Sequence, residues 1–249
     1  DVWRDTPASL LAQIDRDISD GINKFLLFGV PAKKTKTEFD HGFVAEQIRS
    51  IKQQFGSDIW LAVDVCLCSS TTHGHCGILS DAGDAVLNEP SVAALSSAAA
   101  LYAAAGADCV APSDMMDGRI FEMRTLLEDE GHHDVGIMSY SAKYASAFYG
   151  PFRDALDSAP VDLKDVPKDK KTYQMDYANR EEAIKETMMD VDEGADIVMV
   201  KPGLCYLDIV RDIKNAVNIP VSVYQVSGEY AMIKAAAEKG WLDHDAVVL

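Results

Sequence analysis

The sequence predicts an α/β fold in which six parallel strands alternate with helices. The same tripeptide, Gly-Ala-Asp, stands between a predicted helix and the strand that follows it at residues 106–108 and again at residues 194–196. The strand candidates are continuous apolar runs, which is typical of parallel strands covered on both faces. Polar residues that can carry chemistry stand at or just beyond the carboxyl ends of these strands. A (β/α)8 barrel and a doubly wound open sheet both place their sites there, so both remain open.

The first unit begins with a helix that Thr6 can cap and in which Pro7 takes the first position. Its apolar residues recur at helical spacing and form one stripe: Leu10, Leu11, Ile14 and Ile18. Gly21 is placed to end this helix. The apolar run KFLLFG, residues 24–29, follows as a short buried strand.

Two further units repeat this pattern. Their helices run from after Pro90 to Gly106 and from after Asn179 to Gly194, and their strands occupy 109–114 and 197–203. Glu182 stands where it can complete a capping box with Asn179. The other buried-strand candidates are residues 60–67, 135–142 and 221–228. No Gly-rich phosphate fingerprint follows any strand, which weakens the dinucleotide-binding version of the fold.

Six strands are fewer than a barrel needs. The sequence opens directly with a helix and ends soon after a helix that begins near Glu229. We therefore expect residues 1–249 to form a single truncated domain that lacks a first and a last strand and leaves strand edges unpaired. The segment 158–176 is highly charged and contains two prolines, which predicts an active-site lid rather than a linker.

Composition narrows the class of partner. A formal charge of −17 disfavours nucleic acid or an anionic membrane, although a local group of lysines and arginines can still bind a small anion. The apolar runs are too short to span a bilayer, and the first residues lack the pattern of a signal peptide. Five cysteines without a secretory signal indicate a reducing compartment, and three of them crowd into eleven residues.

Those three cysteines predict a metal site. Cys66 and Cys68 stand two apart near the end of a strand, so their side chains point to one face, and Cys76 returns after a Gly-containing loop. Three thiolates can hold zinc and leave a fourth position open, as in catalytic zinc sites. His73 and His75 are candidates for a fourth ligand or a supporting role. The alternative is three buried cysteines beside a histidine-rich loop.

Two lysines predict nucleophilic chemistry. Lys143 follows the strand IMSYSA and Lys201 follows the strand IVMV, and these strands are consecutive. Neighbouring parallel strands lie about 4.8 Å apart, so the two amines can meet at one site. Burial and like charge both lower the pKa of a lysine, from about 10.4 toward roughly 7–8, which frees the amine to attack a carbonyl carbon. The alternative is two solvated surface charges.

Further polar residues surround these positions. They are Ser113, Asp114, Asp117 and Arg119 after one strand, Arg153 ten residues beyond Lys143, Lys170, Lys171 and Gln174 on the predicted lid, and Tyr224 and Ser227 after the last strand. The cationic members can bind a substrate carboxylate, Arg in a bidentate fork. Taken singly, each can equally be an ordinary loop residue.

Several motifs together resemble the porphobilinogen synthase (5-aminolevulinate dehydratase) family in its cysteine-rich zinc subtype. They appear in family order and cover most of the chain: DVCLC at 64–68, HGHCG at 73–77, APSDMMDGR at 111–119, IMSYSAKYASAFYGPFR at 137–153, KKTYQM at 170–175, MVKPG at 199–203, YLDIVR at 206–211 and VYQVSGEY at 223–230. The resemblance implies a TIM barrel that condenses two 5-aminolevulinate molecules asymmetrically to porphobilinogen, for tetrapyrrole biosynthesis. It places the enzyme in the cytoplasm, or in the plastid stroma of a photosynthetic eukaryote.

The resemblance also implies roles for individual residues. Lys201 forms a Schiff base with the substrate that supplies the propionate side, and Lys143 engages the substrate that supplies the acetate side. Cys66, Cys68 and Cys76 bind catalytic zinc, and Asp64 takes part in proton transfer. Arg153, Lys170 and Gln174 bind the second substrate, Ser227 binds the carboxylate of the first, and Ser113 and Tyr224 complete the substrate-binding set. Glu186 matches a position that binds allosteric magnesium in many bacterial members.

The sequence departs from the family at several points. Lys170 replaces an arginine, which keeps the charge and loses bidentate geometry, while Ser70 and Tyr177 replace a common aromatic residue and a proline. The family is homo-oligomeric, and the N-terminal arm that mediates its octamers has no counterpart here. A different Schiff-base aldolase, which has no use for zinc cysteines, and a homologue that binds metal or a partner without turnover remain as alternatives.

Overall fold

A six-stranded parallel sheet organises residues 3–161 and 166–248, which are the residues that this computed structural model describes. The strand order is β1-β2-β5-β6-β7-β8, so every strand pairs with its neighbour in the chain apart from the intervening β3–β4 hairpin. The strands are β1 (Lys24–Leu27), β2 (Trp60–Val65), β5 (Cys109–Pro112), β6 (Gly136–Lys143), β7 (Ile197–Lys201) and β8 (Val221–Val223). The small hairpin joins β3 (Ile78–Leu79) and β4 (Val86–Leu87). This order confirms the predicted parallel α/β sheet.

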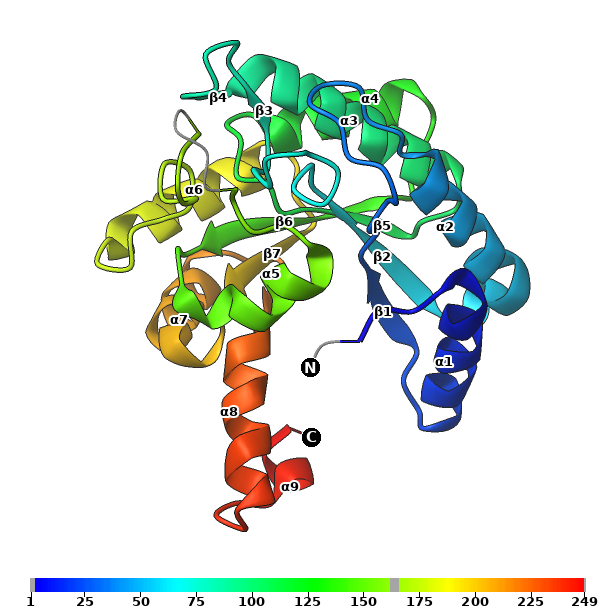
Figure 1. Cartoon of the computed structure of the whole chain (residues 1–249), viewed down its shortest axis with the longest axis vertical. Helices are drawn as coiled ribbons and strands as arrows, with labels where there is room; N and C mark the ends of the chain where they lie inside the picture. The colour runs from blue at the N-terminus through cyan, green and yellow to red at the C-terminus, as the bar shows by residue number, and fades with distance from the viewer. Residues whose placement is uncertain (1–2, 162–165, 249) are drawn as a thin grey trace.

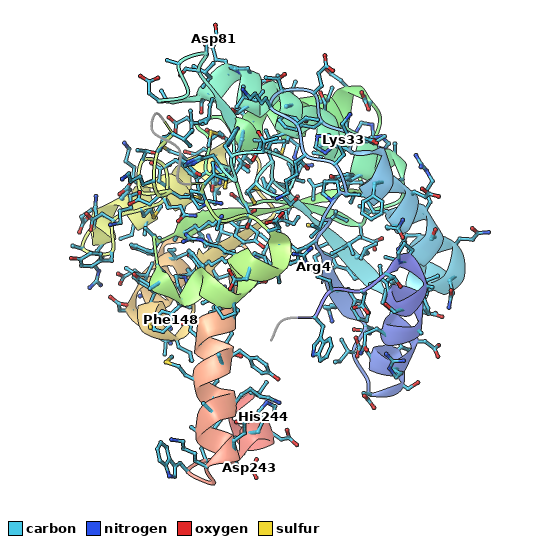
Figure 2. The ribbon with its side chains drawn as sticks, in the orientation of Figure 1. Arg4, Lys33, Asp81, Phe148, Asp243 and His244 are labelled. Carbon is cyan, nitrogen blue, oxygen red and sulfur yellow. The ribbon has the colours of Figure 1, made fainter. Side chains whose placement is uncertain are left out.

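Most of the helices lie along the outer side of the curved sheet (Figure 1). They are α1 (Pro7–Ser19), α2 (Gly42–Phe55), α3 (Asn88–Ala104), α4 (Arg119–Asp129), α5 (Gly150–Leu156), α6 (Arg180–Asp192), α7 (Leu207–Ala216), α8 (Ser227–Glu238) and α9 (His244–Val248), with short 3-10 turns at 56–58, 147–149 and 204–206. Charged residues such as Lys33, Asp81 and Asp243 lie at the exposed periphery (Figure 2). No helix in the described ranges is long and apolar enough to cross a membrane.

The predicted helix ends form by the expected local interactions. Thr6 accepts a hydrogen bond from the backbone N–H of Ser9, 3.2 Å away, and Pro7 is the first residue of α1. Asn179 accepts from the N–H of Glu182 at 3.1 Å and donates its amide to the Glu182 carboxylate. Gly194 follows α6 with a φ of +108°, a conformation that glycine adopts without strain.

Two apolar clusters lie on the two faces of the sheet. The larger packs strands against helices and includes Ile48 of α2, Val63 of β2 and Ile120 of α4. The smaller gathers side chains on the inner face of the sheet: Ala62, Cys109, Ala111, Met138, Tyr140 and Met199. Because side chains alternate along a strand, Asp64 shares the inner direction of Ala62, two residues before it.

The six strands form an open arc rather than a closed barrel. Within the described ranges, β1 pairs only with β2 and β8 only with β7, so these residues do not complete an eight-stranded barrel, as predicted. The last strand is shorter than expected, since β8 ends at Val223 and not at Gly228. The chain turns early because α8 begins at Ser227, two residues before the predicted start near Glu229.

The predicted lid, 158–176, is only partly within the described residues, because 162–165 lie outside them. Its earlier part packs on the cysteine loop, where the N–H of Val161 donates to the carbonyl of His73 at 3.2 Å. A Cβ added to Gly74 would lie 2.3 Å from the carbonyl oxygen of Ala159, so only glycine permits this approach. The later part, 166–176, contributes Lys170 and Gln174 to the cavity that Lys143 and Lys201 line.

Candidate active site

Lys143 and Lys201 are partners at the last rung of the β6–β7 ladder. The register shifts between Ser139 and Ala142, where β6 contains one residue more than β7. This β-bulge inverts the alternation of β6: Tyr140 belongs to the inner cluster, Ala142 to the outer one, and the amine of Lys143 lies back over the Tyr140 ring. Without the extra residue, Lys143 would point outward with Ser139.

Both amines line one cavity, as the sequence predicted. Lys143 is 7% exposed and Lys201 is 4% exposed. The cavity holds about 30 Å³, the space of roughly one water molecule. A substrate of several carbon atoms therefore enters only if side chains or the lid segment move. The chemical roles of the two lysines stay predictions.

Aromatic rings enclose the amine of Lys201. The Lys201 Nζ lies 4.0 Å from the ring centroid of Tyr224, 4.8 Å from that of Phe152 and 5.4 Å from that of Tyr149. Burial is the main cause that lowers the pKa of Lys201 to about 7, and the neighbouring charge of Lys143 lowers it further. A substantial fraction of this amine is therefore neutral and nucleophilic near neutral pH.

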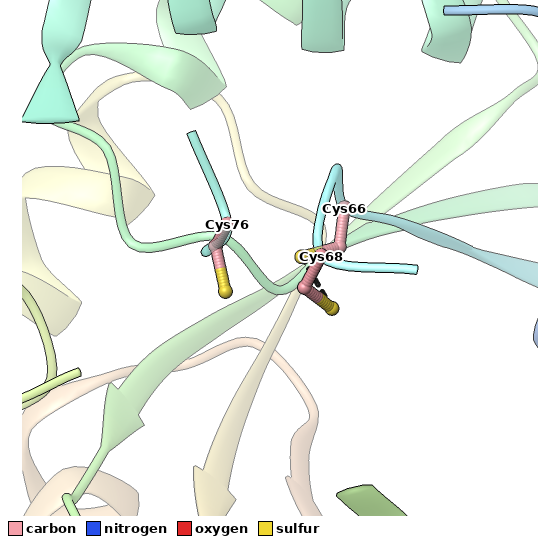
Figure 3. Close-up of side chains that lie close together, drawn as sticks. All are labelled: Cys66, Cys68 and Cys76. Carbon is pink, nitrogen blue, oxygen red and sulfur yellow. Dashed lines mark hydrogen bonds between the residues drawn. The ribbon is translucent and has the colours of Figure 1, made fainter. Parts of the chain in front are cut away.

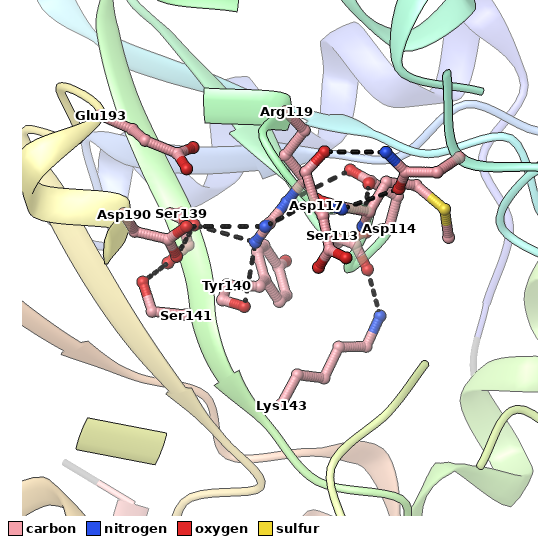
Figure 4. A network of polar contacts seen from close by, with 12 residues as sticks. Ser113, Asp114, Asp117, Arg119, Ser139, Tyr140, Ser141, Lys143, Asp190 and Glu193 are labelled. Atoms are coloured by element: carbon pink, nitrogen blue, oxygen red, sulfur yellow. Dashed lines mark hydrogen bonds and ion pairs between the residues drawn. The ribbon is translucent and has the colours of Figure 1, made fainter. Parts of the chain in front are cut away.

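The amine of Lys143 is held by the loop after β5, where it donates to the backbone carbonyl of Ser113 (Figure 4). Arg119 fastens this loop to β6. Its guanidinium lies 3.6 Å from the Asp114 carboxylate and 3.5 Å from that of Asp190, and it donates to the Ser139 hydroxyl at 3.1 Å. All of these side chains are buried, so the network ties the support of Lys143 to the strand that carries it.

Asp64 lies on the inner face of β2 and lines the same cavity. Burial raises the pKa of its carboxyl to about 6, partly offset by hydrogen bonding from the Ser113 side chain and by the charges of Lys143 and Lys201. Its Oδ1 is buried and lacks a hydrogen-bond partner among the described residues. Asp64 is thus placed to exchange a proton with a molecule in the cavity.

Cys66, Cys68 and Cys76 converge (Figure 3), and Cys68 and Cys76 line the same cavity as the two lysines. Their sulfur atoms all lie within 4.8 Å of one another, and Cys66 Sγ and Cys68 Sγ are 3.3 Å apart. Interactions with the other two thiols, ahead of the charge of Lys170, lower the pKa of Cys76. Tetrahedral zinc with bonds of about 2.3 Å separates its sulfur ligands by about 3.8 Å, so this set fits a metal ion. It is the only group of three potential His, Cys, Asp or Glu ligands in the described ranges.

The two histidines do not join this cluster. The Nδ1 of His75 lies 2.9 Å from the hydroxyl of Tyr173, and its Nε2 lies 2.8 Å from the carbonyl of Pro167. A carbonyl oxygen only accepts, so Nε2 of His75 carries the proton of the neutral ring and Nδ1 accepts from the Tyr173 hydroxyl. The same hydroxyl accepts from the N–H of Cys76 at 3.3 Å. His75 therefore fastens the lid segment to the cysteine loop and is not a fourth ligand.

The predicted carboxylate-binding residues divide into two places. Arg153, Lys170 and Gln174 line the lysine cavity, and the Lys170 amine lies 3.6 Å from the sulfur of Cys76. Ser227 lies at the start of α8, where its hydroxyl accepts from the N–H of Phe152 at 3.0 Å. Glu186 does not line the lysine cavity. It borders a separate cavity with Asp117 and Lys171, and burial raises the pKa of its carboxyl.

Sequence reasoning missed two residues that shape the site. The Tyr149 hydroxyl donates to the carbonyl of Tyr144 at 2.6 Å and lies 3.3 Å from the carbonyl of Lys201. This hydroxyl therefore bridges the ends of β6 and β7. The carboxylate of Glu229 is fully buried and accepts hydrogen bonds from backbone N–H groups only. The position of Glu229, three residues after the helix cap, was the available signal.

Comparison with known proteins identifies the family. The sequence profile of delta-aminolevulinic acid dehydratase, another name for porphobilinogen synthase, matches residues 1–249. The delta-aminolevulinic acid dehydratase of Halalkalibacterium halodurans is 49% identical over 242 residues, which are 96% of this chain and 71% of that protein. The Bacillus subtilis enzyme is 48% identical over 92% of this chain and 69% of its own length. The chain belongs to the delta-aminolevulinic acid dehydratase family.

A solved dehydratase structure has the same fold. The Toxoplasma gondii enzyme, crystallised with the reaction product porphobilinogen, superposes with a TM-score of 0.92 at 43% sequence identity. The match covers 98% of this chain and 70% of the Toxoplasma chain. The six strands therefore correspond to part of the dehydratase TIM barrel.

Proposed function

We propose that the protein condenses two molecules of 5-aminolevulinate asymmetrically to porphobilinogen, with release of two water molecules. The observation that carries this proposal is the pair of buried lysines, Lys143 and Lys201, at one rung of the sheet beside a three-cysteine cluster. Membership of the dehydratase family supports it, and so does the product bound to the related Toxoplasma enzyme.

Lys201 is the first nucleophile in this proposal. Its neutral amine attacks the keto carbon of one substrate, a C–N bond forms, and the carbonyl oxygen leaves as water after proton transfer. The pKa of about 7 keeps enough neutral amine available at physiological pH. The enclosing rings of Tyr224 and Phe152 limit the access of bulk water to this imine.

Lys143 engages the carbonyl of the second substrate in the same manner. Its hydrogen bond to the Ser113 carbonyl orients the amine before the substrate arrives. One C–C bond and one C–N bond then join the two substrates, and both lysines are released when the pyrrole forms. Asp64, with its raised pKa and its unpaired oxygen in the described structure, moves protons between these intermediates.

Cations and hydroxyls recognise the two substrate carboxylates. Arg153 and Lys170 bind that of the second substrate, supported by Gln174, whose Oε1 is buried without a partner among the described residues. Ser227 binds the carboxylate of the first substrate. The Tyr224 ring packs against the carbon chain of that substrate, between the carboxylate and the imine with Lys201. The segment 158–176 acts as a lid, because the small cavity must open to admit either molecule.

Cys66, Cys68 and Cys76 hold zinc in this proposal. When bound, zinc supplies Lewis-acid assistance to a substrate oxygen in the condensation. The chain's contribution is three convergent thiols and the ammonium of Lys170, which balances part of their negative charge.

Three further points are extended from the family. Glu186 binds a regulatory magnesium ion in the separate cavity that it shares with Asp117. The protein acts as a homo-oligomer, because members of the family assemble into octamers. It works in the cytoplasm, or in the plastid stroma if the organism is photosynthetic and eukaryotic.

The direct test is pyrrole formation from 5-aminolevulinate, followed with 4-dimethylaminobenzaldehyde. We expect pyrrole with zinc present and none after treatment with 1,10-phenanthroline, with recovery on zinc addition. Zinc-loaded protein that forms no pyrrole would overturn the proposal, whereas equal activity after verified zinc removal would overturn the role of the cysteines.

A further inference from the structure

Glu229 is a fully buried carboxylate that binds the backbone at two separate places. Its Oε1 accepts from the N–H groups of Leu204 at 2.8 Å and Cys205 at 3.3 Å. Its Oε2 accepts from the N–H groups of Gly203 at 3.2 Å and Val226 at 2.8 Å. Four backbone donors thus converge on one buried charge, an arrangement that fixes both segments strongly.

The two segments carry the groups that would hold the first substrate. Gly203 is two residues beyond Lys201, whose amine is the proposed nucleophile. Val226 immediately precedes Ser227, whose hydroxyl is the proposed carboxylate binder. Glu229 therefore connects, through its side chain, the strand end that presents the amine to the helix start that presents the hydroxyl.

A second contact fixes the same helix start from the other side. Gly228 packs against the backbone of Phe148, where an added Cβ would lie 2.6 Å from the carbonyl oxygen. The Ser227 hydroxyl also accepts from the N–H of Phe152 in α5. Phe148 lies where the segment leading into α5 meets the start of α8 (Figure 2). Ser227 thus has little freedom to move. Glu229 is the side chain that hydrogen-bonds both the backbone just before Ser227 and the backbone just after Lys201.

We propose that Glu229 is a positioning residue that sets the separation between the Lys201 amine and the Ser227 hydroxyl. It thereby selects keto acids with two methylene groups between carbonyl and carboxylate. This inference rests on the proposed roles of Lys201 and Ser227. Because the imine and the carboxylate must be bound at once, a fixed separation rejects a chain with a third methylene.

Borohydride trapping of Lys201 adducts tests this selection with two probes, 4-oxopentanoate and 5-oxohexanoate. Each acid forms an imine with loss of water, and hydride from borohydride reduces the C=N bond to a stable secondary amine. In the unmodified protein, 4-oxopentanoate should be trapped at least about tenfold faster at subsaturating concentration. Mass spectrometry of the Lys201 peptide measures both rates.

Glu229→Gln replaces one acceptor oxygen by an amide group that faces backbone N–H donors. The preference for 4-oxopentanoate should then fall to within about twofold of unity, and its half-saturation concentration should rise about tenfold. Glu229→Asp keeps the charge and should restore part of the preference. Glu238→Gln, at an exposed position of the same helix, is the matched control and should keep the full preference.

The outcomes separate this inference from the proposed function. If the unmodified protein forms no adduct with 5-aminolevulinate, the proposed function fails. If it forms the adduct but traps both keto acids equally, the selection by Glu229 is wrong, even if neither variant folds. A folded Glu229→Gln variant that traps both acids more slowly by the same factor would show a purely structural role and would also overturn the inference.

Discussion

Lys143 lies directly across the parallel ladder from Lys201, and one extra residue in β6 turns both amines to the same face of the sheet. The bulge between Ser139 and Ala142 is anchored by Arg119, which donates to the Ser139 hydroxyl and contacts the carbonyl of Tyr140 at 3.5 Å. The geometry of the two-lysine site therefore depends on a local irregularity in one strand.

The two lysines should be separable by mutation. Lys143→Met should abolish pyrrole formation but leave a borohydride-trapped adduct of 5-aminolevulinate on Lys201, since Lys143 serves only the second substrate. Peptide mass spectrometry and the pyrrole assay measure the two effects on one sample. Loss of the Lys201 adduct in a variant that is still folded would contradict this division of roles.

Trapping at Lys201 should depend on pH with a midpoint near 7. The amine reacts when neutral, so the rate should rise as pH increases through the lowered pKa and then level off. The facing groups are Lys143, Asp64 and the thiols of Cys66 and Cys68. Lys143→Met removes the second-largest cause of the lowered pKa, so its midpoint should move to higher pH.

The control for this pH profile is Lys214→Met, which removes an exposed lysine on α7 and should leave the midpoint unchanged. A midpoint near 10 in the unmodified protein would mean that Lys201 is hydrated in solution. That result would contradict the burial of the Lys201 amine.

The sequence was sufficient for the strands and for the placing of lysines at their ends, because buried parallel strands are continuous apolar runs. It could not predict the bulge in β6, since a period of two assigns Lys143 to the outer face with Ser139. The predicted strand at 221–228 was too long, because the apolar run extends into a helix start that Glu229 caps by accepting from the N–H of Val226, a local signal that the strand pattern obscured. The contact of His75 with Tyr173 joins residues 98 apart, which no local pattern signals.

Zinc binding should depend on each cysteine of the cluster. Cys68→Ala leaves two thiols, so tight zinc binding should be lost while the thermal unfolding temperature of the metal-free protein changes little. Competition with a chromophoric chelator measures the affinity. Cys205→Ala, an exposed cysteine outside the cluster, is the control. Unchanged zinc affinity in the Cys68 variant would place the metal elsewhere.

The hydroxyl of Tyr173 should hold the lid segment on the cysteine loop. Tyr173→Phe leaves the N–H of Cys76 and the Nδ1 of His75 without this partner, at a cost of about 1–3 kcal/mol. We expect faster proteolysis within 166–176 and a higher KM for the second substrate, with Lys201 trapping retained. Tyr177→Phe, at an exposed position nearby, should change neither property. Equal proteolysis of both variants would contradict the proposed anchor.

The central claim is that Lys201 is the first nucleophile, and Lys201→Met tests it most directly. The measurement is borohydride trapping with 5-aminolevulinate, with peptide mapping by mass spectrometry and a parallel assay of porphobilinogen. We predict that the adduct on the peptide containing residue 201 disappears and that turnover is abolished, while the variant folds and binds zinc normally. Porphobilinogen formation by the Lys201→Met variant at the normal rate would contradict the Schiff-base assignment.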